Sequence, residues 1–241
     1  MTPLLGGLAV FWGYLPSAGA AKSKFTFYPG VQNVPQGLVP HVFGTSYAIE
    51  ADLVIPPGGA EGAIVANSDF LGGFSLYIQN GKLHHTYAFL GIPPTPQGRP
   101  HPILAKLLEQ TGRLGPIFRS YTLTSSEPVP TDPVIARFEF IADEPKPGTG
   151  GQTKLLINGN TVAEGRLDHT VVFIFSAYAC MDIGRDNEKP VSWTYKSPFP
   201  FTGTIKTVTF DLEPKQPKTP AEKVEHEKVR QQTLVVADVH G

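Results

Sequence analysis

The segment FSLYIQ-NG-KLHHTYAF, residues 74–89, predicts a β-hairpin near the middle of the chain. Phe74, Leu76 and Ile78 alternate with other side chains, so they form one face of an extended strand. The turn between the two runs is Asn80-Gly81. Asn-Gly in this position is the strongest short signal for a hairpin, because both turn residues must adopt positive φ angles.

Further strands are expected on both sides of this hairpin. In Tyr47–Ile55, apolar residues occupy every second position, while Glu50 and Asp52 share the other face. This pattern predicts a strand with one buried face and one solvent-exposed face. The remaining expected strands are Gly62–Ala66, Val134–Ile141, Lys154–Ile157, Asn160–Glu164 after a second Asn-Gly turn, Val171–Phe175 as a central strand, and Thr204–Leu212 with a bulge near Lys206-Thr207. Many short strands at close spacing predict an all-β, antiparallel β-sandwich of the jelly-roll, concanavalin-like type.

The bulk properties are those of a single folded domain with tails. The chain has 241 residues, 25 glycines and 24 prolines, dispersed in the manner of turns between strands. Its formal net charge is −1, and no basic stripe indicates a nucleic-acid partner. The single cysteine, Cys180, excludes an intrachain disulfide, and its apolar neighbours predict a buried, unreactive thiol.

The sequence divides into a leader, a domain and a tail. Residues 1–22 form an apolar leader that ends in small residues but lacks the positive charge of a signal peptide, and it is too short and too broken for a membrane span. The chain is expected to be secreted or periplasmic if the leader is a signal peptide, and cytoplasmic otherwise. The β-sandwich is expected over residues 23–213, and a linker with a charged helical tail over 214–241.

An insertion is expected within the sandwich, over about residues 93–115. Within it, Ile103–Gln110 places its apolar residues on one helical face, after Pro102 and before Gly112. The sandwich pattern does not require this helix.

No complete catalytic constellation is present in the sequence. Glu50 and Asp52 lie on one strand face, as carboxylates do in some jelly-roll glycosidases, but Val54 stands where a third acid would be expected. A solvated sheet face is therefore the preferred reading, and a glycosidase is a third hypothesis. His84 and His85 are adjacent on a strand, so they point to opposite faces and cannot ligate one metal together, and His101 lies in the insertion.

The richest polar cluster runs from Asp182 to Asn187. Asp182, Asp186 and Asn187 offer hard oxygen ligands around a glycine turn, which suits calcium, although Arg185 weakens that reading. The alternative is a structural turn at a sheet edge. Trp193 and Tyr195, just beyond, are candidates for stacking on a sugar or a partner surface, and ordinary packing is the alternative.

The order of several short motifs resembles the C-terminal region of bacterial-type arylsulfatases, over roughly Lys24 to Leu212. No single motif is specific, and the resemblance rests on their number and order. The motifs are Phe25-Thr26-Phe27-Tyr28-Pro29-Gly30, Ser46–Asp52, Ile55–Gly62, Gly72–Tyr77, Gly81-Lys82-Leu83, Arg137–Phe140, Val162–Arg166, Asp182-Ile183-Gly184 and Phe201-Thr202-Gly203.

The resemblance implies a non-catalytic accessory β-sandwich. In that family the catalytic domain uses a formylglycine made within a C/S-x-P-x-R motif, whereas Cys180 is followed by Met181-Asp182-Ile183-Gly184. The leading hypothesis is that the domain packs on a sulfatase catalytic domain, or shapes its substrate entrance. The alternative is a stand-alone glycan- or calcium-binding module of the lectin or laminin-G type.

Overall fold

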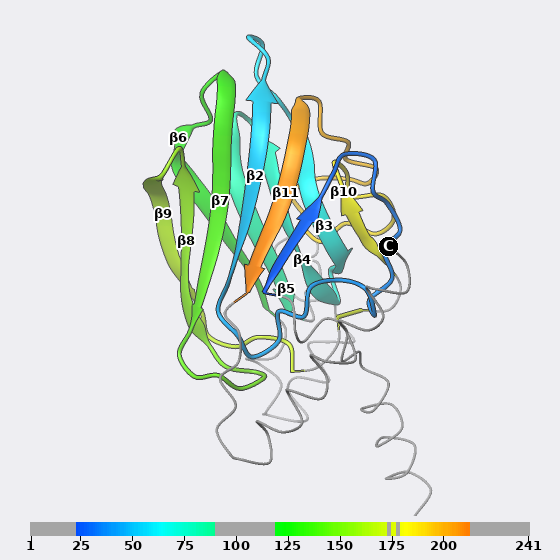
Figure 1. Ribbon diagram of the computed structural model, residues 1–241, viewed down its shortest axis with the longest axis vertical. Coiled ribbons are helices and arrows are strands. Elements are labelled where there is room, and N and C mark those ends of the chain that lie inside the picture. Colours follow the sequence, from blue (N-terminus) through cyan, green and yellow to red (C-terminus); the bar gives the residue numbers. More distant parts are fainter. Residues whose placement is uncertain (1–22, 90–118, 173–174, 177–178, 213–241) are drawn as a thin grey trace, which may run out of the picture.

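The computed structural model describes residues 23–89, 119–172, 175–176 and 179–212, and these residues form two antiparallel β-sheets (Figure 1). The six-stranded sheet has the order β1-β11-β2-β7-β8-β9 and the five-stranded sheet the order β10-β3-β4-β5-β6. The strands are β1 (Lys24–Phe27), β2 (Tyr47–Ile55), β3 (Gly62–Asp69), β4 (Gly72–Gln79), β5 (Lys82–Phe89), β6 (Arg119–Pro128), β7 (Asp132–Ala142), β8 (Gly151–Ile157), β9 (Asn160–Leu167), β10 (Met181–Ile183) and β11 (Thr204–Leu212).

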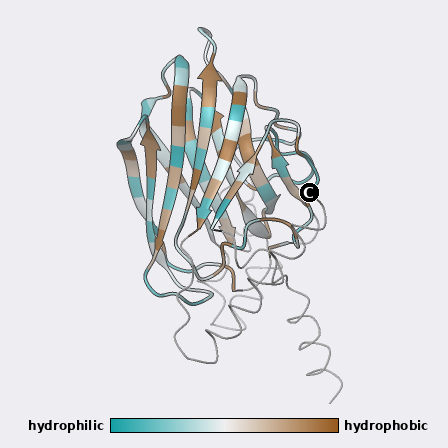
Figure 2. Cartoon of the chain, viewed as in Figure 1, coloured by the Kyte–Doolittle hydropathy of each residue, from teal (hydrophilic) through white to brown (hydrophobic). Residues whose placement is uncertain are grey.

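One hydrophobic core fills the space between the two sheets. Alternate side chains of each strand point inward, and apolar and polar bands accordingly alternate along the front strands (Figure 2). From the six-stranded sheet, Ile49, Leu53 and Phe138 are fully buried, and Phe74 and Leu76 face them from the five-stranded sheet. The predicted β-sandwich is therefore confirmed.

The two predicted Asn-Gly turns are confirmed with the backbone that they require. Asn80 and Gly81 have φ angles of 52° and 71°, and they join β4 to β5 with Gln79 opposite Lys82. Asn158 and Gly159 have φ angles of 50° and 81° and join β8 to β9. The bulge expected in the last strand is also present, because the pairing of β11 with β2 shifts register between Ile205 and Thr207.

The prediction of a central strand at Val171–Phe175 is wrong. The described residues of this segment lie outside the strands, and Phe175 is buried against Phe43, Phe74 and Tyr87, at ring-centroid distances of 4.7, 5.6 and 5.9 Å. The backbone N–H of Val171 donates to the Tyr87 hydroxyl. Val171 and Phe175 thus pack on the core from outside the strands, which the pattern of residues does not distinguish from a buried strand.

Several expectations fall on residues outside the described part of the chain. These are the leader (1–22), the insertion (93–115) with its helix and His101, and the tail (214–241) with its helix. The described residues contain no helix with the length and apolar character needed to cross a membrane.

Candidate functional site

The outer face of the five-stranded sheet carries two rows of polar side chains that cross the strands. The register aligns Ser75 of β4 with Thr86 of β5 and Thr122 of β6. The next row is Tyr77, His84 and Thr124. The two histidines point to opposite faces, as predicted, because His85 is buried in the core beside Phe138 while His84 lies against Tyr77 on the outer face.

A loop from Gly184 to Pro200 covers the β3–β4 side of this face. Its residues Val191, Tyr195 and Phe199 form a small hydrophobic cluster with Tyr77 and with alanines of the sheet. This second cluster explains why every residue of β3 is buried, since the core covers one face of the strand and the loop covers the other. The outward side chains of β6 remain exposed, Thr122 and Thr124 among them.

Five hydroxyl groups meet where the loop reaches the sheet. The Tyr77 hydroxyl lies 3.2 Å from Thr86 Oγ1, 3.3 Å from Ser192 Oγ and 3.0 Å from Thr194 Oγ1. Thr86 Oγ1 lies 2.9 Å from Thr122 Oγ1. We call Thr194, Ser192, Tyr77, Thr86 and Thr122 the hydroxyl row. Either partner can donate in each of these bonds, so the row can reverse the direction of its hydrogen bonds.

His84 forms the neighbouring edge of the site. Its ring stacks on Tyr77, with centroids 4.9 Å apart and planes at 10°. Nε2 lies 3.1 Å from the carbonyl oxygen of Gln79, which can only accept, so Nε2 carries a proton. In the neutral ring Nδ1 then accepts from the Thr124 hydroxyl, 3.0 Å away. Partial burial is the main cause that lowers the pKa of His84 below its ordinary value.

Trp193 supplies an exposed aromatic ring on the loop that covers the sheet. It lies between Ser192 and Thr194 in the chain, its side chain is 37% exposed, and its ring contacts Phe70 at a centroid distance of 4.5 Å. Tyr195 differs from it, since it is 7% exposed and stacks on Phe199 at 4.5 Å. Of the two predicted ligand-binding aromatics, the structure therefore places only Trp193 at the surface.

Asp186 stabilises the loop from Gly184 to Pro200, the covering loop, by hydrogen bonds within it. Its Oδ2 accepts hydrogen bonds from the Tyr195 hydroxyl at 2.6 Å and the Val191 N–H at 3.0 Å, and its Oδ1 accepts one from Ser197 at 3.3 Å. Burial raises the pKa of Asp186, although these bonds act in the opposite direction.

The other two predicted calcium ligands, Asp182 and Asn187, lie before and after Asp186 in the chain. Asp182 belongs to β10 and accepts from the Asn33 N–H at 2.7 Å, while Asn187 is half-buried. Among the described residues, no group of three or more His, Cys, Asp and Glu side chains is arranged to hold a metal ion. Calcium at Asp182, Asp186 and Asn187 stays a prediction. Cys180, one residue before β10, is half-buried, and burial raises the pKa of its thiol.

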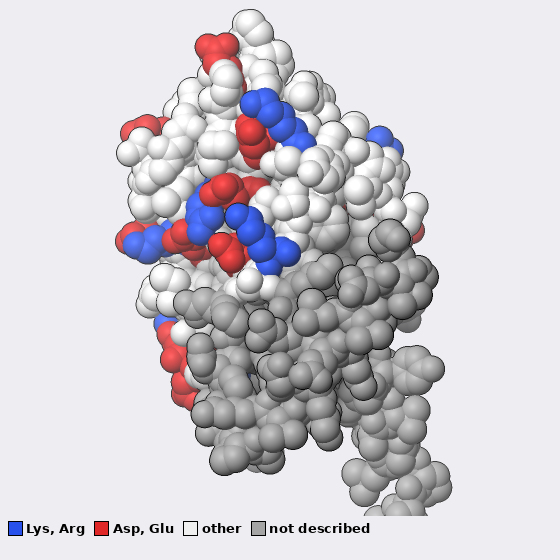
Figure 3. Space-filling model, in the orientation of Figure 1, with Lys and Arg blue, Asp and Glu red and all other residues white. Residues whose placement is uncertain are grey.

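The outer face of the six-stranded sheet differs in character, because it carries charges of both signs (Figure 3). Arg137 bridges Glu50 at 2.9 Å and Glu139 at 2.7 Å, and Lys206 lies 3.2 Å from Asp52. Glu50 and Asp52 are thus on a solvated face, as predicted, and each has a basic partner.

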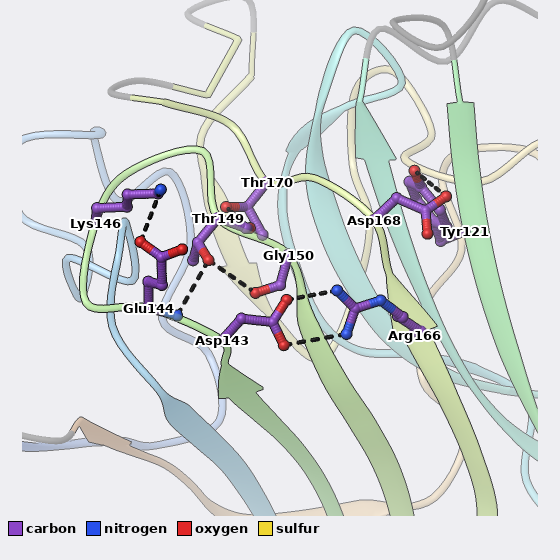
Figure 4. A network of polar contacts seen from close by, with 9 residues as sticks. All are labelled: Tyr121, Asp143, Glu144, Lys146, Thr149, Gly150, Arg166, Asp168 and Thr170. Atoms are coloured by element: carbon purple, nitrogen blue, oxygen red, sulfur yellow. Dashed lines mark hydrogen bonds and ion pairs between the residues drawn. The ribbon is translucent and has the colours of Figure 1, made fainter.

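A further polar network fixes the loop between β7 and β8 (Figure 4). Arg166 of β9 holds both carboxylate oxygens of Asp143, which lowers the pKa of that carboxyl group. Thr149 accepts from the Glu144 N–H, and its carbonyl oxygen accepts from Thr170 at 2.8 Å. Each of these groups has a partner within the network, so we assign the network a structural role.

Comparison with known proteins finds similarity to solved structures, and this similarity concerns the fold alone. No family model matches the sequence, and no curated protein matches it. Among solved structures, domains LG4-5 of the mouse laminin α1 chain are 8% identical with a TM-score of 0.40, over 84% of this chain and 43% of that one. The CBM40 of the Ruminococcus gnavus IT-sialidase, bound to α2,6-sialyllactose, is 14% identical with a TM-score of 0.41, over 80% and 93%. Sheep galectin-11 in complex with glycerol is 10% identical with a TM-score of 0.31, over 80% and 98%.

Proposed function

We propose that this protein is a carbohydrate-binding module whose site is the outer face of the five-stranded sheet, at the hydroxyl row and Trp193. The observation that carries the proposal is an exposed indole that lies, along the chain, between two members of a row of hydroxyl groups that can donate or accept. A sugar presents both matching features, an apolar ring face and hydroxyl groups of either polarity. Binding sites combine a few polar groups with aromatic surface in this manner.

The exposure of the row supports binding over a purely structural role. Ser192 and Thr86 are buried, whereas Thr194 and Thr122 at the two ends of the row are exposed. A hydroxyl group has one donor and two acceptor sites, so the exposed ends retain capacity for a ligand. The chain of bonds between them would hold those ends in place before the ligand arrives, which lowers the cost of ordering the site.

A glycan array probed with the purified chain tests the proposal, followed by calorimetry with the glycans that bind. Trp193→Ala and Thr122→Val are expected to weaken binding at least tenfold. Thr26→Val is the matched control, because Thr26 is an exposed threonine of the opposite sheet that pairs with Thr209. No glycan binding, or equal losses in all three variants, would refute the assignment.

The order of the short motifs supports a second, more specific candidate, an accessory domain of an arylsulfatase-like protein that packs on a catalytic domain or subunit. This candidate is compatible with glycan binding, since an accessory domain can hold a sugar near a catalytic centre. We expect the purified chain not to hydrolyse p-nitrophenyl sulfate. Turnover that persists after chelation and repurification would contradict this candidate.

A further inference from the structure

The charges around the hydroxyl row indicate which class of sugar it can bind. All five side chains of the row are neutral. The ammonium group of Lys82 on β5 donates a hydrogen bond to the carbonyl oxygen of Ser126, at 3.3 Å. At His84, Lys82 and Glu61 act in opposite directions. None of the five side chains of the row is therefore cationic, and beside the row the charge of Lys82 is opposed by that of Glu61.

The charge directly behind the row is negative. Tyr195 packs edge-on against Tyr77, with centroids 4.9 Å apart, and its hydroxyl group donates a hydrogen bond to Asp186. The three donors that the structure gives to the Asp186 carboxylate are a phenol, a serine hydroxyl and a backbone N–H, all of them neutral. None of these donors brings a positive charge to the carboxylate.

Resting on the proposed function, we propose that the site binds uncharged saccharides and discriminates against sugars that carry a carboxylate or a sulfate. An anionic sugar would lose water on binding without gaining from the row a charged donor, such as arginine or lysine, that compensates for this loss. It would also be repelled by Asp186. A neutral sugar meets neither cost, because its hydroxyl groups exchange hydrogen bonds with water for hydrogen bonds with the row.

The first experiment compares matched pairs of glycans on the purified chain. The array would hold neutral oligosaccharides beside the same structures bearing a sialic acid, a uronic acid or a sulfate at a single position. We expect neutral members to bind at least tenfold more tightly than their charged partners. Equal or tighter binding of the charged partners would overturn this inference and leave the proposed function intact, whereas no binding of either class would overturn both.

The second experiment adds the missing charge. Thr122→Lys places an ammonium group at the exposed end of the row, and we expect it to reduce the preference for neutral glycans at least tenfold. Thr26→Lys adds the same charge to the opposite sheet and is expected to leave the preference unchanged. If both lysine variants change the preference equally, net charge rather than this site determines selectivity, and the inference is wrong.

Discussion

The imidazole of His85 lies parallel to the ring of Phe138, with ring centroids 3.4 Å apart and planes at 9°. His85 belongs to β5 and Phe138 to β7, so this contact joins the two sheets through the middle of the core. Phe74 flanks the imidazole at 6.3 Å, and Nε2 has no hydrogen-bond partner among the described residues. A histidine in these surroundings must be neutral, and burial lowers its pKa to about 3.

The stability of the protein is therefore expected to decrease in acid. The unfolded chain takes up a proton at His85 near pH 6.5, whereas the folded chain does so only near pH 3. Between these values the unfolded state binds more protons, so the contribution of His85 is complete above pH 6.5 and is lost as the pH falls. From pH 7 to pH 4 this loss amounts to about 3 kcal/mol.

Urea unfolding of the wild type and of His85→Leu at both pH values measures this contribution. The variant should lose about 3 kcal/mol less than the wild type between pH 7 and pH 4. The test compares the change in the free energy of unfolding between the two proteins. Asp186 is present in both, and because its pKa is raised, its contribution to stability increases as the pH falls. Identical pH dependence in both proteins would show that His85 is not the buried neutral group.

The hydrogen bond from Tyr195 to Asp186 leads to a second prediction. Tyr195→Phe removes one of the three donors to a buried carboxylate, and we expect it to lower the free energy of unfolding by about 1–3 kcal/mol. The pKa of Asp186 should also rise further, which carbon-detected NMR titration can follow. Tyr28→Phe alters a tyrosine that is 61% exposed and should leave the free energy of unfolding unchanged within about 0.5 kcal/mol.

The strands that the sequence predicted well are those with local signals. Tyr47–Ile55 alternates strictly, and the strand has those bounds, while the hairpin of residues 74–89 carries its own turn. The strands that it missed lack such signals. β1 has four residues and β10 has three, which is too short for a clear pattern. In β6 the inward-facing Tyr121 and Leu123 are only partly buried. Pairing with β11, β3 and β5 holds these segments extended.

The candidate site was less predictable than the strands, because its residues meet only through the tertiary fold. Trp193 could be selected from the sequence as an aromatic beside a polar cluster. The hydroxyl row could not, since Tyr77 and Thr194 are 117 positions apart and Thr86 and Thr122 are 36 apart. The one available signal was the alternation of His84, Thr86, Thr122 and Thr124 with side chains of the core, and it required β6 to be recognised as a strand.

Calcium provides a third prediction, about the turn from Asp182 to Asn187. All three donors to Asp186 lie within the covering loop, so a cation there would have to displace the Tyr195 hydroxyl. We expect millimolar calcium to leave the midpoint of thermal unfolding unchanged. A midpoint that rises with calcium, in proportion to RT ln(1 + [Ca]/Kd), and that no longer does so in Asp182→Asn, would establish the predicted metal site.

The last prediction concerns the pH dependence of glycan binding through His84. In the neutral ring, Nδ1 accepts from Thr124, and protonation would force the Thr124 hydroxyl to turn round and accept instead. Because burial lowers the pKa of His84 from 6.5, glycan affinity should be constant from pH 8 to pH 6.5 and fall at lower pH. The expected loss is about three- to tenfold, the value of one hydrogen bond.

His84→Phe keeps an aromatic ring against Tyr77 and removes the titrating nitrogen, so its glycan affinity should be the same at pH 5 as at pH 7.5. Calorimetry with one neutral glycan at both pH values, on wild type and variant, makes this comparison. Circular dichroism at pH 5 must show both proteins folded, since protonation of His85 also acts in this range. An acid loss of affinity that is equal in the two proteins would assign the effect to another group.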